Sequence, residues 1–440
     1  MSTITTHTTA VQTYLQEAQE FADRFGTTSP EWMAFRRAAA DVFAKTGFPT
    51  TKHEEWKYLN FSSLQSGGFR TASPNDVQRL ESKDAAEFRL AGTDAALIVI
   101  ENGKLNTAAS TLNALPAGIR VGGLDELGHL PEVQAHLYKH AAVEGEPFVA
   151  HNTMLSFSPV IVLVEKKAKV QQPVQLAMVA MAGMDAVCVP VRILVVAEEQ
   201  SECTIMESYH THGNGLPIFT NSVTETVIGK AAVVHYSKVQ VENDSTTHVA
   251  YHKVHHARDS YQHLTTLTLG GSLVRNNLHI RLDDEQINSY LNGLYVVNGT
   301  QVVDNHTLVD HAMPNCHSNE LYKGIIDEQG QGVFNGKIWV RQDAQKTNAY
   351  QSNKNLLLSN EASMNTKPQL EIYADDVKCS HGATTGQLDE EALFYLRARG
   401  IGEANARALL NHAFAADVIN QVENESIRES LMVLLDGKLS

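Results

Sequence analysis

The sequence predicts a mainly β protein in which a parallel β-helix core lies between two helical regions. Strand-like pieces follow one another from about residue 155 to 385 with almost no helical periodicity. Gly and Asn residues separate these pieces, as at Gly270-Gly271 and Asn276-Asn277. A β-sandwich, a propeller or a coiled solenoid would each produce this pattern. No regular repeat of about 40 residues, as in propeller blades, is visible, and a parallel β-helix tolerates loose repeat lengths, so it fits best.

Residues 1–150 predict a separate helical and α/β region. Residues 9–25 place apolar side chains on one face of a helix. Ser29-Pro30 predicts the start of a second helix, because serine caps helices and proline is tolerated in the first turn. Gly47 predicts the end of that helix. Further along, two elements are predicted: a strand over Ala95–Ile100 and a helix over Leu127–His140.

The strand-like pieces define a core domain over residues 151–386. Many of them alternate apolar residues with Thr, Ser, His or charged residues, which is typical of strands with two different faces. The predicted strands are Val160–Val164, Val174–Ala180, Val189–Val196, Cys203–Ser208, Ser222–Ile228, Val233–Val241, His248–His255, Leu264–Leu269, Leu278–Leu282 and Ile338–Arg341.

Residues 387–440 predict a carboxy-terminal helical domain. The strand that begins at Ile372 gives way after Gly386 to a helix, with Asp389 as its N-cap and Gly400 just past its end. Two more helices are predicted, over residues 403–414 and 417–435. Such an appendage either covers an open sheet edge or docks a partner protein, and the pattern alone leaves both alternatives open.

Composition excludes several classes of function. The chain has 440 residues and a net charge of −15, which argues against a nucleic-acid surface. Its four cysteines show no C-x-x-C spacing, so neither a disulfide framework nor a zinc finger is indicated. The first residues lack the pattern of a secretory signal, and no apolar run approaches the ~20 residues needed to cross a membrane. We therefore expect a soluble, cytoplasmic protein with reduced thiols.

Cys379 and His381 are the sharpest chemical signal in the chain. If the strand continues through them, residues i and i+2 point to the same face. A thiolate beside an imidazole suits iron, zinc or copper. Two residues do not complete a metal site, however, and a buried free cysteine beside a hydrogen-bonded histidine is the plainer alternative. Asp375-Asp376 either supplies oxygen ligands or starts a turn.

Other clusters of residues that could bind a metal give weaker evidence for a metal site. Cys316-His317 follows His306 and His311, but adjacent strand residues point to opposite faces, so Cys316 and His317 are not expected to share a metal. A dense run of histidines is expected at solvent-facing strand positions rather than at a metal site: His248, His252, His255, His256 and His263.

The chain shows no nucleotide-binding loop of its own. Gly336-Lys337-Ile338 resembles the end of a phosphate loop, but the glycine required at position 331 is Gln331, and Ile338 stands where Ser or Thr is needed. A G-x-S-x-G nucleophile motif is also absent from the sequence. These absences lower the expectation of a self-sufficient enzyme. If the protein is nevertheless an enzyme, the alternative function is that of a stand-alone metal-dependent β-helix enzyme.

Several sequence blocks, in a fixed order along the core domain, resemble those of a known family. The blocks are Gly270-Gly-Ser-Leu-Val-Arg275, Leu291-Asn-Gly293-Leu-Tyr, His306-Thr-Leu-Val-Asp-His311, Ser318-Asn-Glu-Leu-Tyr-Lys323-Gly, Val333-Phe-Asn-Gly336-Lys337-Ile, Ala344-Gln345-Lys346-Thr347 and Pro368-Gln-Leu-Glu-Ile372. With them the sequence resembles the SufB/SufD family of iron–sulfur cluster assembly proteins. SufB-like sequences look more like His-Glu-Ala where this chain has Cys379-Ser-His381, and the resemblance is therefore to the SufD branch.

The resemblance implies a right-handed parallel β-helix flanked by amino- and carboxy-terminal helical regions. It implies a non-catalytic scaffold subunit that pairs with SufB through sheet edges and binds the SufC ATPase through its carboxy-terminal helices. The chain on its own would then be largely free of metal, or would form a homodimer. At Cys379 and His381 it implies a place where transient iron or a nascent Fe–S cluster is shared with SufB, which is consistent with a half-site that releases its cluster.

Overall fold

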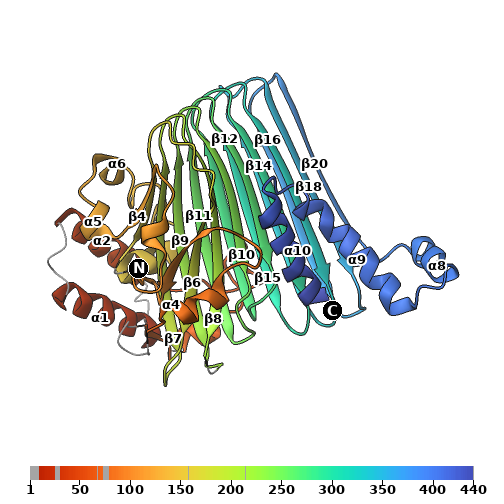
Figure 1. Ribbon diagram of the computed structural model, residues 1–440, viewed down its shortest axis with the longest axis horizontal. Helices are drawn as coiled ribbons and strands as arrows, with labels where there is room; N and C mark the ends of the chain where they lie inside the picture. Colours follow the sequence, from red (N-terminus) through yellow and green to blue (C-terminus); the bar gives the residue numbers. More distant parts are fainter. Residues whose placement is uncertain are drawn as a thin grey trace, which may run out of the picture.

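The computed structural model describes residues 9–24, 30–66, 68–72, 79–156, 158–213 and 215–439. Its core is a parallel β-solenoid of about 8 turns, which confirms the predicted fold class. Helices lie at the amino-terminal side and the carboxy-terminal side of this coil (Figure 1).

Two ten-stranded sheets form the walls of the solenoid, and the chain alternates between them. Neighbouring strands within each sheet are parallel except at the start, where β4 pairs antiparallel with β5 and β3 with β2. The first sheet contains β1 (Arg70–Thr71), β4 (Ile119–Gly122), β5 (Val160–Val164), β7 (Val187–Ala197), β9 (Ile218–Ile228), β11 (Thr246–His256), β13 (Leu273–Leu282), β15 (Val302–His311), β17 (Gln331–Val340) and β19 (Ser363–Ile372). The second sheet contains β2 (Ala96–Glu101), β3 (Lys104–Leu105), β6 (Val174–Met181), β8 (Glu202–His212), β10 (Val233–Gln240), β12 (Tyr261–Thr268), β14 (Asn288–Val297), β16 (His317–Ile326), β18 (Thr347–Leu357) and β20 (Val377–Gly386).

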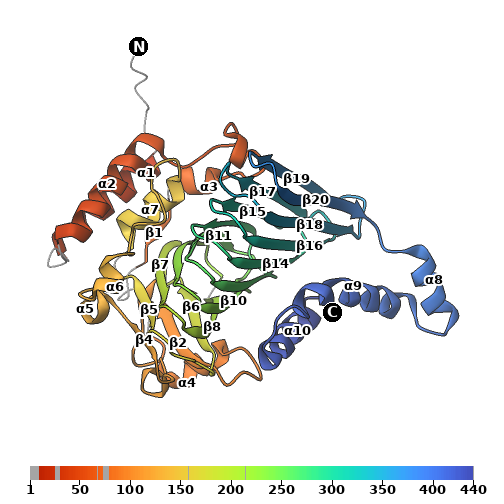
Figure 2. The same ribbon diagram turned by 90° about the horizontal axis from the view of Figure 1, so that it is seen from above.

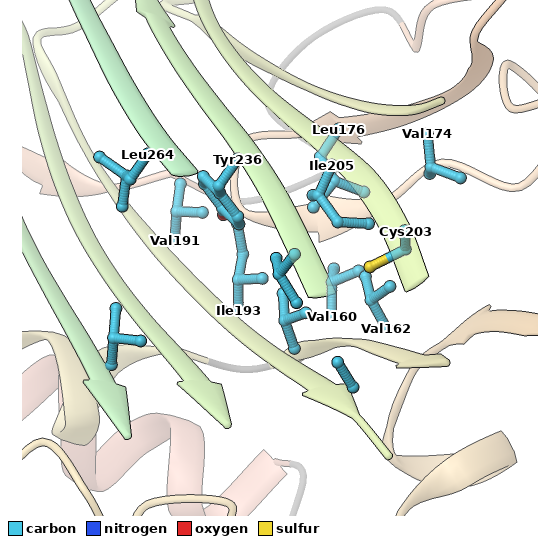
Figure 3. Close-up of a cluster of buried hydrophobic side chains, with 14 of the residues drawn as sticks. Val160, Val162, Val174, Leu176, Val191, Ile193, Cys203, Ile205, Tyr236 and Leu264 are labelled. Carbon is cyan, nitrogen blue, oxygen red and sulfur yellow. The ribbon is translucent and has the colours of Figure 1, made fainter. Parts of the chain in front are cut away.

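Alternation along each strand sends every second side chain into the lumen of the coil. In the first turns these side chains are apolar and fully buried, as Figure 3 shows for Val162, Leu176, Ile193 and Ile205. β5 and β7 are buried on both faces, because helices cover their outer side. Such strands read as unbroken apolar runs, which is why the sequence revealed them most clearly.

A left-handed corner residue stands in seven of the turns from the first sheet to the second, but not in the last one, between β19 and β20. Seven non-glycine residues adopt a positive φ at this point: Lys167, Gln200, Ala231, Asp259, Gln286, Asn315 and Lys346. The amide of Gln200, for example, donates to the carbonyl of Lys230 in the next turn, 2.8 Å away. These bonds between successive corners help to offset the cost of the left-handed backbone and fix the register of the coil.

Amino-terminal helices cover the outer face of the first sheet. The main ones are α1 (Thr9–Arg24), α2 (Pro30–Thr46) and α7 (Pro147–Leu155), and short elements complete the region: η1 (Glu54–Trp56), α3 (Ser62–Gln65), α4 (Ser82–Ala85), η2 (Ala86–Phe88), η3 (Leu112–Ala114), α5 (Leu124–Leu127) and α6 (Pro131–Gln134). α7 is buried along its whole length between α2 and the sheet. Pro30 begins α2 as predicted, whereas the predicted cap Ser29 lies outside the described residues.

The carboxy-terminal helices are α8 (Glu390–Ala398), α9 (Glu403–Ile419) and α10 (Glu425–Leu439). The Asp389 side chain accepts hydrogen bonds from Glu391 N and Ala392 N, and Gly400 adopts a positive φ, so both predicted ends of α8 are confirmed. α9 and α10 bury Val418, Ile419 and other apolar residues against the outer face of the second sheet. Lys323, buried on β16, fastens α9 by donating to Phe414 O at 2.9 Å and to Asp417 Oδ2 at 2.5 Å.

Two predicted elements need correction, and five strands were missed. Leu127–His140 is not one helix, because Gly128 ends α5 and Pro131 begins α6, which is followed by turns. α9 does not break near residue 415 but continues to Ile419, where it packs on the sheet. Five strands after Leu282 were not predicted from the pattern, namely β14, β15, β16, β18 and β19. Their lumen side chains include many polar groups, which breaks the apolar alternation on which the prediction relied.

Candidate functional site

The last turn of the solenoid, formed by β19 and β20, has no described element covering its end. Figure 2 shows these strands at the end of the coil opposite to β2 and β4. Residues of β20 are mostly exposed, whereas those of its neighbour β18 alternate between buried and open positions. The outer edge of each strand therefore offers unpaired backbone groups, a ready template for another β chain.

β20 presents Cys379 and His381 together, on the face that continues the lumen. Cys379 pairs in register with Ala349, and His381 pairs with Gln351; both partners are buried. Ser380 between them pairs with Tyr350, whose ring is exposed on the outside of the coil. Cys379 is half-buried against the apolar group around Ile338, and His381 is exposed. The strand thus continues through both residues, which is the condition under which residues two apart share a face.

The thiol of Cys379 is held in its neutral form. Burial raises its pKa above the ordinary value, and a hydrogen bond with the backbone of Ala349 opposes this shift. A thiolate, not a thiol, binds a soft metal, so binding of any such metal by this side chain would release a proton. Asp375 and Asp376 lie in the exposed turn ahead of β20, where the backbone of Asp376 is bonded to the preceding corner.

Within the described part of the chain, no group of three or more His, Cys, Asp or Glu side chains is arranged to hold a metal ion. Cys379 and His381 are thus at most a half-site in this chain. Their position at an uncovered end leaves both side chains open to a second protein chain seated on β20. The assignment of these two residues as metal ligands remains a prediction.

Two residues beneath the site were missed by sequence reasoning. Gln351 lies one turn below His381, and Glu320 lies one turn below Gln351. The Gln351 amide donates to Glu320 Oε2 over 2.8 Å, across 31 positions of sequence. The signal that would have found them is the spacing of one solenoid turn, which is 29 residues between Arg275 and Asp304 and 31 between Glu320 and Gln351.

Glu320 gives the solenoid a pH-dependent stability. Burial raises the pKa of its carboxyl to about 7, from an ordinary value of 4.5. Because the folded state holds this proton more tightly than the unfolded chain, the stabilising effect is complete below pH 4.5 and is lost as pH rises through 7. We expect the stability of Glu320→Gln relative to the native chain to grow by about 3 kcal/mol between about pH 4 and about pH 8.

Urea unfolding of the native chain and of Glu320→Gln at the two pH values checks this expectation. Glu202→Gln is the matched control, because Glu202 is a partly exposed carboxylate paired with Lys169. Equal pH dependence in the native chain and in Glu320→Gln would contradict the prediction.

The second cluster of predicted ligand types does not form a site. Cys316 is buried, its Sγ donates to the carbonyl of Asp284, and burial raises its pKa to about 11. His317 lies on the outer face beside Tyr290 and Tyr350. His311 is buried in the lumen against Ser318, whereas His306 lies outside between Asp304 and Glu55. These four side chains therefore point in different directions.

The histidine-rich stretch was predicted to face solvent, and this is wrong for most of it. Four of its members are buried: His248, His252, His256 and His263. His248, His252 and His256 lie on the lumen face of β11, where His248 Nδ1 is 2.7 Å from Glu242 and His252 Nε2 is 2.9 Å from the Thr226 hydroxyl. Histidine is tolerated there because the middle of the lumen is polar and hydrogen-bonded. Only His255 is partly exposed, paired with Asp283.

No helix among the described residues has the length and apolar character needed to cross a membrane.

Comparison with known proteins assigns the family. Residues 179–414 match the family described as SUF system FeS cluster assembly, SufBD core domain, and residues 8–176 match the SufBD protein N-terminal region. An iron–sulfur cluster assembly SufBD family protein of Synechocystis is 32% identical over 97% of this chain and 95% of its own length. The iron–sulfur cluster assembly protein SufD of Escherichia coli is 30% identical over 90% of each chain. Protein ABCI7 of Arabidopsis thaliana, a chloroplastic protein, is 29% identical over 97% of this chain and 90% of its own.

Two family matches cover nearly the whole chain, and two relatives at 30% identity or more span almost their full length. These findings agree with the solenoid and with the motifs read from the sequence. The chain therefore belongs to the SufBD family of iron–sulfur cluster assembly proteins.

Proposed function

We propose that this chain is a non-catalytic scaffold subunit of the SUF iron–sulfur cluster assembly complex. In this proposal it pairs with SufB through the edges of β19 and β20, and it binds the SufC ATPase through its carboxy-terminal helices. Iron and the nascent cluster are cargo, held transiently between the two scaffold subunits. The chain acts in the cytoplasm of its cell.

One observation carries this proposal: the uncovered last turn displays a thiol and an imidazole side by side. A site that must deliver its cluster benefits from few ligands on each chain, because each subunit alone holds the cargo weakly. Cys379 and His381 supply a soft donor and a borderline donor for iron. Closure by SufB would exclude water and add the remaining ligands, and separation would release the cluster.

His381→Ala tests this function. The side chain is exposed, so the variant should fold and assemble with SufB and SufC as the native chain does. We expect its iron and acid-labile sulfide content after reconstitution to fall severalfold, since the half-site loses its more accessible ligand. Both quantities are measured on the purified three-subunit complex.

His317→Ala is the matched control, because His317 is a partly exposed histidine on the outer face of the same sheet. It should leave cluster content unchanged. Native cluster content in His381→Ala would contradict the assigned ligand. A metal-loaded isolated chain that turns over a substrate would instead favour the stand-alone enzyme.

ATP hydrolysis has a mechanical role in this proposal. α8 joins the solenoid just after β20, and its residues Phe394 and Tyr395 are exposed. Two SufC molecules that approach each other on binding ATP would pull on the helical domains of the paired scaffolds. Because the connection runs directly into β20, this movement would open the interface at Cys379 and His381.

A further inference from the structure

One column of lumen side chains changes character at the open end of the solenoid. In successive turns of the second sheet the register aligns Leu264 with Leu291, Leu291 with Glu320, Glu320 with Gln351, and Gln351 with His381. The two leucines and the two middle polar residues are buried. A buried acid and a buried amide therefore stand directly beneath the exposed His381, where apolar residues continue the stack further down.

Gln351 is held in one orientation. Its Nε2 donates to Glu320 Oε2 at 2.8 Å, so that its Oε1 is the group left for another partner. Among the described residues this Oε1 has no hydrogen-bond partner, although it is buried. A buried acceptor without a donor costs on the order of 1–3 kcal/mol, so this one calls for an explanation.

Gly336 makes room for this arrangement from the opposite wall. A Cβ on Gly336 would stand 2.4 Å from Gln351 Nε2. Only a residue without a side chain lets the amide lie here, and any larger residue would push Gln351 away from Glu320. The position of Gln351 is therefore fixed by two independent contacts from two different strands.

The residue that carries this free acceptor is in register with His381 on the neighbouring strand. Side chains that are in register on neighbouring strands lie about 4.8 Å apart, close enough for an amide and an imidazole to form a hydrogen bond. A histidine that binds a metal through one ring nitrogen commonly donates its other N–H to a carbonyl or carboxylate. This bond selects the tautomer and the ring orientation.

We propose that Gln351 is a positioning residue for His381. Its Oε1 accepts the N–H of one ring nitrogen of His381, and the bond to Glu320 keeps the amide turned so that Oε1 faces the open end. The other ring nitrogen is thereby left deprotonated and directed toward the subunit interface. The tautomer control is a property of this chain alone; its use in holding iron rests on the proposed function.

The tautomer of His381 in the isolated chain is the direct test. Histidine is labelled with 15N, and the His381 signals are identified by their loss in His381→Ala. At about pH 8.5, where an ordinary imidazole is neutral, the native chain should show one tautomer. Gln351→Met, which keeps length and volume but removes the acceptor, should show a mixture of both tautomers.

A charge-preserving exchange separates positioning from mere packing. In the double variant Glu320→Gln with Gln351→Glu, the amide and the acid trade places, and a carboxylate oxygen again faces His381. This variant should restore the single tautomer. Gly336→Ala should also produce a mixture of the two His381 tautomers, because its methyl group on the opposite wall would displace Gln351. This variant provides the test if Gln351→Met fails to fold. The same tautomer ratio in the native chain and in the folded Gln351→Met or Gly336→Ala chain would overturn the proposal.

Metal affinity gives a second measurement with a separate meaning. In the complex with SufB, Co2+ titration should show about 10–100-fold weaker binding for Gln351→Met than for the native chain, the usual loss when the partner of a ligating histidine is removed. If His381→Ala leaves Co2+ binding intact while Gln351→Met still mixes the tautomers, the proposed function fails and the positioning role stands. If the tautomer does not respond, the positioning role fails whatever the metal does.

Discussion

Replacing Phe394 by Asp should abolish binding of the SufC ATPase while leaving the fold intact. Phe394 lies on α8 with 73% of its surface exposed, and its neighbour Tyr395 is 56% exposed. Large aromatic residues at this exposure are typical anchors of a protein interface, and loss of one anchor costs 2 kcal/mol or more, roughly a thirtyfold or greater loss of affinity. Introducing a charge at the centre of that contact should cost more still. The measurement is co-purification with SufC, followed by titration calorimetry.

Met184→Asp is the matched control, since Met184 is an apolar residue that is even more exposed than Phe394 and lies on a solenoid loop far from α8 in sequence. It should bind SufC normally. Native affinity in Phe394→Asp would place the docking surface elsewhere, on the exposed sides of α9 or α10, where Leu409 and Val433 lie.

A point variant is preferable to deletion of the helical domain. Truncation after Gly386 would remove the whole helical domain, but α9 and α10 cover apolar residues on the outer face of the second sheet, among them Met206, Leu267 and Leu294. Deletion would expose this face to water and invite aggregation. Loss of SufC binding after deletion would then have two causes that could not be separated.

Replacing Glu225 by Leu should destabilise the protein by about 3–5 kcal/mol, the usual cost of removing one partner of a buried ion pair. Glu225 Oε2 lies 2.6 Å from Arg192 Nη2, and both side chains are fully buried. The same carboxylate accepts hydrogen bonds from the backbone amides of Tyr138, His140 and Ala141. It therefore joins the amino-terminal region to the first sheet, and its loss would leave Arg192 Nη2 and the three backbone amides without this acceptor, with only the Arg192 Nη1 bond to Thr153 remaining.

The electrostatics of Glu225 set the direction of its pH effect. Burial alone would raise the pKa of this carboxyl, but Arg192 and the backbone amides of Ala141 and His140 lower it below the ordinary value. The pair thus stabilises the fold at neutral pH, and this contribution is lost as pH falls through the folded-state pKa.

Urea unfolding at neutral pH measures the loss in Glu225→Leu. Glu199→Gln, which removes an exposed partner of Lys166, is the control and should change the midpoint little. Comparable midpoints for Glu225→Leu and the native chain would show that the buried pair is replaceable by apolar packing.

Short-range rules explain what could be read in advance. The N-cap Asp389 and the left-handed Gly400 act on residues within a single helix. The sequence around them was therefore sufficient to predict where α8 begins and ends. The shared face of Cys379 and His381 followed from the two-residue period of a strand, which is also local, on the condition that a strand runs through both residues, as β20 does. The ordered family blocks fixed the expectation of a β-helix with helical ends, and the coil confirms it.

The sequence by itself determined the class of fold, the family, the cap of α8 and the shared face of Cys379 and His381. Only the tertiary structure decided that His248 and His252 face a polar lumen, that α9 covers the second sheet, and that Gln351 and Glu320 stand beneath His381. The physical reason is the stacking of a parallel solenoid, which brings together residues one whole turn apart, as in the 31 positions between Glu320 and Gln351. Local periodicity shows which residues share a face, but not which residues a full turn away will touch them.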